Sequence, residues 1–190
     1  MNNLINYLLQ FGHLNQQQVT LIKENVKILH LEMGAYFSEA GDVAKRVAFV
    51  NEGILRVCYY DRYGKENTRY FVDENNFAVD LNSFLHRIPS SEYIQAVVPT
   101  QLYVFSAESL HKLSSTIIIW DSMINEVTSK ALLEKVHRIS PMLAEDAKTR
   151  YLEFFKRFPQ VANRVPLSYL ASYIGITQHS LSRIRREISE

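Results

Sequence analysis

The sequence contains a single cysteine, Cys58, among its 190 residues. One thiol cannot close a disulfide within the chain, complete a thiolate zinc site or hold an iron–sulfur cluster, because each of these requires several cysteines. The histidines offer no substitute, since they are scattered and form neither a His-x-His pair nor a His-Glu helix motif. They stand at His13, His30, His86, His111, His137 and His179. These absences argue against a cupin-like metal enzyme, and we expect no metal, no cofactor and no enzymatic activity.

Long apolar runs are also missing. The longest, Thr116–Trp120 and its close surroundings, is far shorter than the roughly 20 residues that cross a bilayer. The first residues, Met1–Ile5, contain no basic stretch and no small-residue cleavage site, so we read no secretory signal. We therefore expect a cytoplasmic protein without a membrane partner.

Charge is nearly balanced over the whole chain but not along it. Hydrophobic residues are 47% and charged residues 22% of the sequence, which are the proportions of a folded protein. Residues 1–147 hold 13 Lys/Arg against 17 Asp/Glu, a net charge of −4, while residues 148–190 hold 8 against 3, a net charge of +5. A small basic end on an acidic body is typical of a polyanion-binding domain, although a solvated charged face would give the same counts.

Two kinds of periodicity divide the first half of the chain. The first thirty residues fit two short amphipathic helices, interrupted at Gly12–Asn15. From Ile28 to Phe105 there follow short alternating runs, rich in β-branched and aromatic residues and broken by turn formers about every 8–12 residues. The turn formers are Gly34, Gly41-Asp42, Asn51–Gly53, Asp61–Gly64 and Asn75-Asn76. This pattern predicts an antiparallel β-roll of roughly seven to eight strands.

After Ser106 the apolar residues follow the three- and four-residue steps of a helix. No Gly or Pro occurs from Ala107 to Ser140, so one long helix is predicted, with an apolar stripe as narrow as that of a coiled coil. The stripe consists of Leu110, Leu113, Ile117, Trp120, Ile124, Val127 and Ala131. We interpret it as a dimer seam, while a helix packed on the β-roll would bury the same stripe.

Ser140-Pro141 is expected to end that helix and to act as a hinge, because the residue before a proline disfavours the helical conformation. The chain then divides into a sensor domain with a helical lead-in at residues 1–106, a dimerisation helix at 107–139 and an all-α domain at 140–190. This is an α+β fold. In the last domain a helix is predicted from Leu143 to Phe158, with core residues Tyr151, Leu152, Phe154 and Phe155.

The stretch Val165–Arg186 carries the most specific pattern. Pro166 suits the first position of a helix, Gly175 allows a left-handed turn, and Thr177 can cap a second helix. The remaining anchors are apolar and face inward: Leu167, Leu170, Ala171, Ile174, Ile176, Leu181, Ile184 and Ile188. Together they describe a helix-turn-helix rather than an ordinary helical hairpin.

The opposite face of the second helix predicts contacts to DNA. With the apolar anchors inward, a rotation of about 100° per residue exposes His179, Ser182, Arg183 and Arg186, with Gln178 at the leading end. Gln and Arg can make bidentate contacts to adenine and guanine edges in the major groove, while His179 can equally be a plain surface histidine. Three further side chains are better placed for phosphate: Arg185, Arg164 and Ser168.

The order of β-roll, heptad helix, hinge and helix-turn-helix resembles the Crp/Fnr family of bacterial transcription regulators over residues 15–188. Phe37–Asp42 looks like the family's early strand and turn, Phe49–Val57 like its central hairpin, and Tyr60–Glu66 like the next turn. The resemblance implies a homodimer that places two recognition helices in successive major grooves of a palindromic site. It implies double-stranded DNA as the partner, and it adds RNA polymerase and an unidentified small-molecule effector as further candidates.

The sequence departs from cyclic-nucleotide-binding relatives at the effector site. In those relatives a Gly-Glu pair opens a short helix and an Arg-Ser/Thr pair follows it, so that the glutamate holds the ribose and the arginine the phosphate. Here Val79 stands in place of the glycine, Asp80 in place of the glutamate, and Ser90 or Ser91 in place of the arginine. Without that cation, and with Glu92 nearby, a buried cyclic phosphate lacks its charge-assisted hydrogen bonds. We expect no response to cAMP or cGMP, unless Arg69 or Arg87 supplies the cation from another position.

Other branches of the family fit no better. One cysteine cannot ligate an oxygen-sensing cluster, and no histidine stands in a recognisable haem context. The sequence ends at Glu190 without the small β-hairpin wing that often contacts phosphate in relatives. We therefore expect DNA affinity to depend more on Arg183, Arg185 and Arg186.

An alternative function is a sensor module whose β-roll binds an effector or a protein and whose helix-turn-helix has weak or lost DNA binding. The chain contains 11 tyrosines and 10 phenylalanines, several of them in the β-roll. Such aromatic residues either line a ligand pocket or fill a core.

Overall fold

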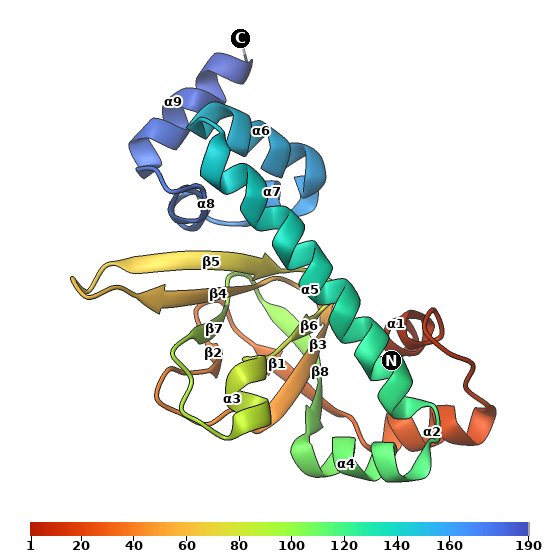
Figure 1. Cartoon of the computed structure of the whole chain (residues 1–190). Helices are drawn as coiled ribbons and strands as arrows, with labels where there is room; N and C mark the ends of the chain where they lie inside the picture. Colours follow the sequence, from red (N-terminus) through yellow and green to blue (C-terminus); the bar gives the residue numbers. More distant parts are fainter. Residues whose placement is uncertain (190) are drawn as a thin grey trace.

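The computed structural model describes the backbone of residues 1–189 and the side chains of residues 1–134 and 145–188 (Figure 1). The helices are α1 (Asn2–Leu8), α2 (Gln16–Glu24), α3 (Leu81–His86), α4 (Ala107–Thr116), α5 (Trp120–Ala144), α6 (Ala147–Arg157), α7 (Pro159–Arg164), α8 (Leu167–Ile174) and α9 (Gln178–Ser189). The strands are β1 (Lys27–Leu31), β2 (Tyr36–Ser38), β3 (Arg46–Glu52), β4 (Leu55–Tyr60), β5 (Glu66–Val72), β6 (Phe77–Ala78), β7 (Tyr93–Ala96) and β8 (Thr100–Ser106).

The strands form two four-stranded sheets, in the orders β1-β8-β3-β6 and β2-β7-β4-β5, and their pairings are antiparallel. Side chains alternate between the two faces of each strand, so that Val50, Leu55, Val57 and Leu102 meet in a buried core between the sheets. The predicted β-roll and the α+β class are confirmed. The described part of the chain has eight strands, the upper end of the predicted range.

The predicted turn formers lie between strands. Gly34, Gly41, Gly53 and Gly64 have positive φ angles, as does Asn75. Gly53 leaves no choice of residue, because its φ is +102° and an added Cβ would lie 2.7 Å from the carbonyl oxygen of Pro99. Here the backbones of two turns approach too closely for a side chain.

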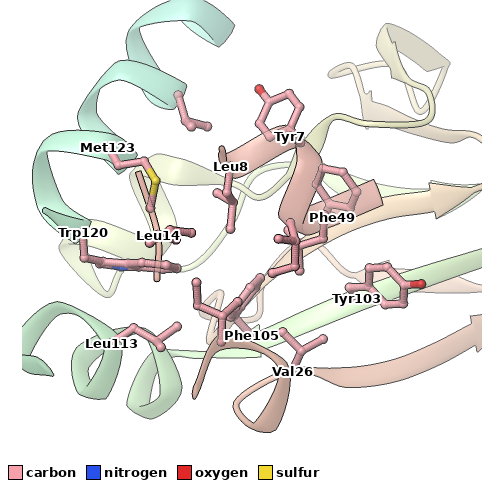
Figure 2. Close-up of a cluster of buried hydrophobic side chains, with 14 of the residues drawn as sticks. Tyr7, Leu8, Leu14, Val26, Phe49, Tyr103, Phe105, Leu113, Trp120 and Met123 are labelled. Atoms are coloured by element: carbon pink, nitrogen blue, oxygen red, sulfur yellow. The ribbon is translucent and has the colours of Figure 1, made fainter. Parts of the chain in front are cut away.

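A second core covers the outer face of the first sheet (Figure 2). Phe49 and Phe105 of the sheet meet side chains of α1, α2, α4 and α5, and the rings of Phe105 and Trp120 lie 6.4 Å apart between centroids. The helical lead-in is confirmed as α1 and α2, with a break at the predicted place. Asn15 then caps α2 by accepting the N–H of Gln18 at 2.9 Å.

The prediction of one unbroken helix from Ala107 to Ser140 is wrong, because the chain turns between α4 and α5. Ile117 ends α4 with extended backbone angles and is 1% exposed. It opens a run of three isoleucines, whose branched side chains lose rotamer freedom in a helix. Turning there allows Ile117 and Trp120 to enter the same core.

The predicted break at Ser140-Pro141 is also wrong, since α5 continues to Ala144. A proline removes one backbone hydrogen-bond donor from a helix. Pro141 lies three residues before the end of α5, and the helix continues past it for those last residues. The break comes instead just before α6, where Asp146 accepts the N–H of Thr149 at 2.8 Å. The dimerisation helix predicted at 107–139 is therefore two helices, and the second extends beyond the predicted boundary.

The apolar stripe predicted as a dimer seam lies inside this chain's own second core. Leu113, Ile117, Trp120 and Val127 are at most 6% exposed there, and Leu110 and Ile124 pack against them. Ala131 is exposed. The seam assignment does not hold for the buried positions, because the β-roll, α1 and α2 cover them. The stripe instead packs on the β-roll, as in the second interpretation given above.

The helices α6 to α9 enclose a third core, to which the β-roll contributes Ile54, Phe71 and Val97. Figure 1 shows this C-terminal group beside β4 and β5, at the far end of α5 from α1 and α2. Tyr151 and Phe154 are buried as predicted. Leu152 and Phe155 are 40% and 38% exposed, because the one face of α6 that meets the core does not include them.

Candidate nucleic-acid interface

The pair α8 and α9 has the geometry of a helix-turn-helix. Gly175 follows α8 in the left-handed conformation, with φ 81°, and its N–H donates to the carbonyl of Ala171 at 3.0 Å. Thr177 then accepts the N–H of Ser180 at 3.1 Å, which caps α9. The inward anchors of both helices are buried, at 0–9% exposure: Leu170, Ala171, Ile174, Leu181 and Ile184.

Two details of the predicted motif differ. Pro166 precedes α8 as its N-cap residue, one position before the predicted start. Ile188 is 40% exposed rather than inward, because the core ends one turn earlier at Ile184. Neither difference changes the outward face of α9.

The predicted base-contacting residues share that outward face. Gln178, His179, Ser182, Arg183 and Arg186 are all exposed. Positions separated by three or four residues lie on one side of a helix, so these five form a continuous polar and basic strip. The side chain of Arg183 is 70% exposed, and its Nε lies 3.9 Å from the carboxylate of Glu187, one turn further along α9. An exposed ion pair at this distance is weak, so the guanidinium of Arg183 remains available for contact with another molecule.

The predicted phosphate-contacting residues do not form one group. Ser168 is exposed at the start of α8, and Arg185 is half-buried. Arg164, at the end of α7, points toward the β-roll instead, where its Nη1 lies 2.6 Å from Oε1 of Glu74.

No pattern in the sequence indicates that α8 packs against β5. β5 is the edge strand of its sheet, so part of its backbone lacks a neighbouring strand. The hydroxyl of Ser172 accepts the N–H of Thr68 at 2.9 Å and donates to the carbonyl of Glu66 at 3.5 Å. Phe71 adds ring contacts to Phe154 and Tyr173. The helix-turn-helix thus covers the edge of the β-roll.

A buried arginine lies under this interface. Arg56, on β4, is 1% exposed, and its guanidinium carbon lies 3.6 Å from the ring centroid of Tyr169 on α8. It donates from Nε to Gln95 Oε1 at 2.8 Å and forms an ion pair with Glu66. The hydrogen bond from Arg56 lowers the pKa of Glu66 below its ordinary value, despite the opposing effect of burial. The one sequence signal was an arginine in an otherwise apolar strand.

The predicted effector segment forms a closed polar cluster around Asp80. Asp80 caps α3, with Oδ1 accepting the N–H of Ser83 at 3.0 Å, while Oδ2 accepts the hydroxyl of Ser90 at 2.6 Å. A carboxylate thus occupies the N-terminal end of this short helix. Val79 is half-buried beside it and Ser91 is exposed.

Neither alternative cation approaches this cluster as a free group. Arg69 pairs with Glu92, at 2.5 Å between Nη1 and Oε1. Arg87 is exposed and ends α3 in the left-handed conformation. The inside of the β-roll is filled by its apolar core.

The described residues contain no group of three or more His, Cys, Asp or Glu side chains that could hold a metal ion. No helix within the described part is long and apolar enough to cross a membrane.

A family model of the cyclic nucleotide-binding domain matches residues 28–116, from β1 to the end of α4. The β-roll is therefore similar to this domain family. The match concerns the fold. At the effector segment, positions 79–91, this chain carries the polar cluster around Asp80 described above. No curated protein matches the chain.

Solved structures share the whole arrangement of cyclic nucleotide-binding domain and C-terminal helices. The c-di-GMP responsive global regulator CLP of Xanthomonas campestris aligns with a TM-score of 0.72 and 15% identity, over 92% of each chain. A protein of Eubacterium rectale assigned to the Crp/Fnr family of transcriptional regulators aligns with a TM-score of 0.72 and 19% identity, over 97% of this chain and 88% of that one. FixK2 of Bradyrhizobium japonicum aligns with a TM-score of 0.70 and 15% identity, over 86% of this chain and 84% of that one. The chain therefore has the fold of Crp/Fnr regulators.

Proposed function

We propose that this protein is a non-enzymatic, DNA-binding transcription regulator of the Crp/Fnr type. The observation that carries the proposal is the outward face of α9, where Gln178, Arg183 and Arg186 are exposed on a helix whose other face is anchored in a core. Arginine and glutamine side chains on such a helix can read base edges in the major groove. A bacterial regulator of this type would act in the cytoplasm, where the DNA lies, and RNA polymerase is the further partner that regulation at a promoter would involve.

The proposal includes a homodimer, because two recognition helices one helical turn of DNA apart bind a palindromic site. Since the predicted seam is buried within the chain, we assign the contact to the exposed side of α5. Leu132 and Leu133 are 50% and 60% exposed there. Exposed leucines on a long helix are suited to pairing with a second copy.

The proposal also includes insensitivity to cAMP and cGMP. Asp80 places a negative charge where a cyclic phosphate would meet the N-terminal end of α3, and Arg69 is paired with Glu92. Titration calorimetry with both nucleotides is the direct test. Binding at micromolar concentration would contradict this part of the proposal.

The test of DNA binding is selection from a random duplex pool with the purified protein, at near-physiological salt. We expect a palindromic consensus. A double variant, Arg183→Ala with Arg186→Ala, should lose the enriched sequences. The matched control is Arg62→Ala with Lys65→Ala, which removes the same charge from the turn between β4 and β5 and should retain them. Enrichment that survives the α9 variant would contradict the assignment.

One observation favours the alternative of an effector-binding sensor. A cavity of about 540 Å³ lies between α1, α5, the turn after β5 and the end of α6. Its lining is polar rather than aromatic and includes Asn3, Asn6, Asn76, Lys130, Glu134 and Arg157. The aromatic residues proposed as a pocket lining mostly fill the cores instead, as Phe49 and Phe105 do. A pool selection without enrichment, in a protein that remains folded, would favour this alternative.

A further inference from the structure

One ion pair connects the β-roll directly to the helix-turn-helix domain. Glu74, in the turn after β5, accepts from Arg164, at the end of α7, with 2.6 Å between Oε1 and Nη1. Ninety residues separate the two in the sequence. The side chains are 27% and 34% exposed, so the pair lies at the rim of the interface where water and other ions have access.

The carboxylate of Glu74 is held in place from its own side. Its Oε1 also accepts the N–H of Gly53 at 2.9 Å, which ties the side chain to the close turn between β3 and β4. The arginine is held in place by the packing of α8 on β5, through Ser172 and Tyr169. The two groups therefore meet because the domains are docked, and they would separate if the helix-turn-helix domain moved away.

Arg164 is also a candidate for contact with DNA. It lies four residues before Ser168, at the end of the helix-turn-helix where the first helix begins, and its charge suits a phosphate. A guanidinium held by a carboxylate at 2.6 Å is turned toward that carboxylate and cannot place the same N–H on a phosphate. Glu74 and the DNA backbone are thus competitors for one side chain.

We propose that Glu74 is an autoinhibitory residue, which withholds Arg164 from the DNA backbone while the helix-turn-helix domain is docked on the β-roll. This inference rests on the proposed DNA-binding function. It adds that DNA affinity is set partly by a residue of the β-roll that touches no DNA. Release of Arg164 then accompanies movement of the domain, so any signal that loosens the α8–β5 interface increases affinity.

The test compares Glu74→Gln with the wild-type full-length protein on the duplex obtained by selection. Glutamine retains an oxygen for the N–H of Gly53 but loses the charge that holds Arg164. We expect the affinity to rise about threefold to tenfold, and the plot of log affinity against log salt concentration to steepen by about 0.9, the value for one additional phosphate contact. Glu92→Gln is the matched control, because Glu92 pairs with Arg69 within the β-roll, and it should leave both quantities unchanged.

A second substitution identifies the source of the gain. Arg164→Ala should change the wild-type affinity less than twofold, yet it should remove the whole gain when combined with Glu74→Gln. A gain that survives in the double variant would show that Glu74 merely repels DNA, and it would overturn the inference. An unchanged affinity and salt slope in Glu74→Gln would overturn it too.

Two further outcomes keep the test independent of folding and of the proposed function. If Glu74→Gln does not fold, Glu74→Asp shortens the side chain with its charge intact, and it should give a smaller gain of the same kind; no gain in that variant would count against the inference. Absence of DNA binding in both the wild type and the Glu74 variants would overturn the proposed function, and the inference with it.

Discussion

The guanidinium of Arg56 lies against the ring of Tyr169, 3.6 Å from its centroid, and this contact joins the start of β4 to α8. Within the sheet, the guanidinium of Arg56 contacts Glu66, Gln95 and Thr68. Tyr169 adds a contact to the same guanidinium from α8. A charge in this position is tolerated because the domains are docked. The interface between β-roll and helix-turn-helix is therefore part of the stability of both.

Replacing Arg56 should test this. Arg56→Met removes one partner of a largely buried pair, and we expect a loss of about 2–4 kcal/mol in the free energy of unfolding, since Glu66 and Gln95 lose their donor. Arg69→Met is the control, because Arg69 is 54% exposed and its pair with Glu92 contributes about 0–1 kcal/mol. Urea denaturation of both variants measures the difference. Equal losses would show that burial of Arg56 adds nothing.

The same pair predicts a dependence of stability on pH. Arg56 lowers the pKa of Glu66 in the folded protein, so the stabilisation is complete above the pKa of an unfolded glutamate, roughly 4.3, and is lost as the pH falls through the lower folded value. Unfolding free energies from pH 7 to pH 3 should therefore decrease at the acid end. Glu66→Gln should start lower at pH 7 and decrease less steeply. A parallel curve for this variant would contradict the assignment.

Gly53 should tolerate no side chain. In Gly53→Ala the new Cβ would meet Pro99 and Thr100 at 2.4–2.7 Å in a left-handed conformation, and we expect a loss of at least about 2 kcal/mol. Gly64→Ala has a similar φ, +75°, with nothing within 4 Å, and should lose only about 1 kcal/mol. Thermal and urea unfolding distinguish the two. Similar losses would mean that conformation alone, and not the close approach, determines the cost.

Two substitutions in α5 should separate folding from dimerisation. Trp120→Glu buries a charge in the second core, where Trp120 is 3% exposed, and should destabilise the fold itself by several kcal/mol, about 3–5. Leu132→Glu changes an exposed position and should leave the unfolding temperature nearly unchanged while converting the protein to monomers in analytical ultracentrifugation. A stable dimer of Leu132→Glu would remove this side of α5 from the proposed contact.

Within α9 the two kinds of DNA contact should respond differently. Arg183→Ala removes an exposed side chain of the outward strip and should lose about 1–3 kcal/mol at the selected site while relaxing the choice of one base. Arg185→Ala should weaken binding to all duplexes to a similar extent. Binding titrations with the selected duplex and with single-base variants measure both. The same loss for both variants on every duplex would contradict the division into base and phosphate contacts.

The sequence predicted the β-roll and the helix-turn-helix because their signals are local. Gly175, Leu170 and Leu181 define a turn and two anchors within a dozen residues, and the alternation from Ile28 to Phe105 marks strands one by one. The bend at Ile117 escaped prediction because the steps from Leu113 to Ile117 and Trp120 continue the helical spacing across it. One continuous helix and two helices joined by a bend thus have the same spacing of apolar residues when those residues enter the same core.

The contacts between domains were beyond prediction for another reason. Ser172 and Thr68 are 104 residues apart, and Arg164 and Glu74 are 90 apart, so no periodicity relates them. Arg164 carried the right charge for phosphate, and only the fold shows that a carboxylate lies closer. Burial of the apolar stripe of α4 and α5 likewise depends on α1 and α2, whose own patterns do not specify their partner.

The position of Ser172 on β5 also bears on how the β-roll would behave alone. With α8 removed, the N–H of Thr68 and the carbonyl of Glu66 on this edge strand would lose Ser172 as their partner, and Phe71 would lose its contact with Tyr173. Unpaired edges with exposed aromatic rings are templates for strand addition between molecules. The packing of α8 thus covers an edge that, if exposed, would favour contacts between the β-rolls of different molecules.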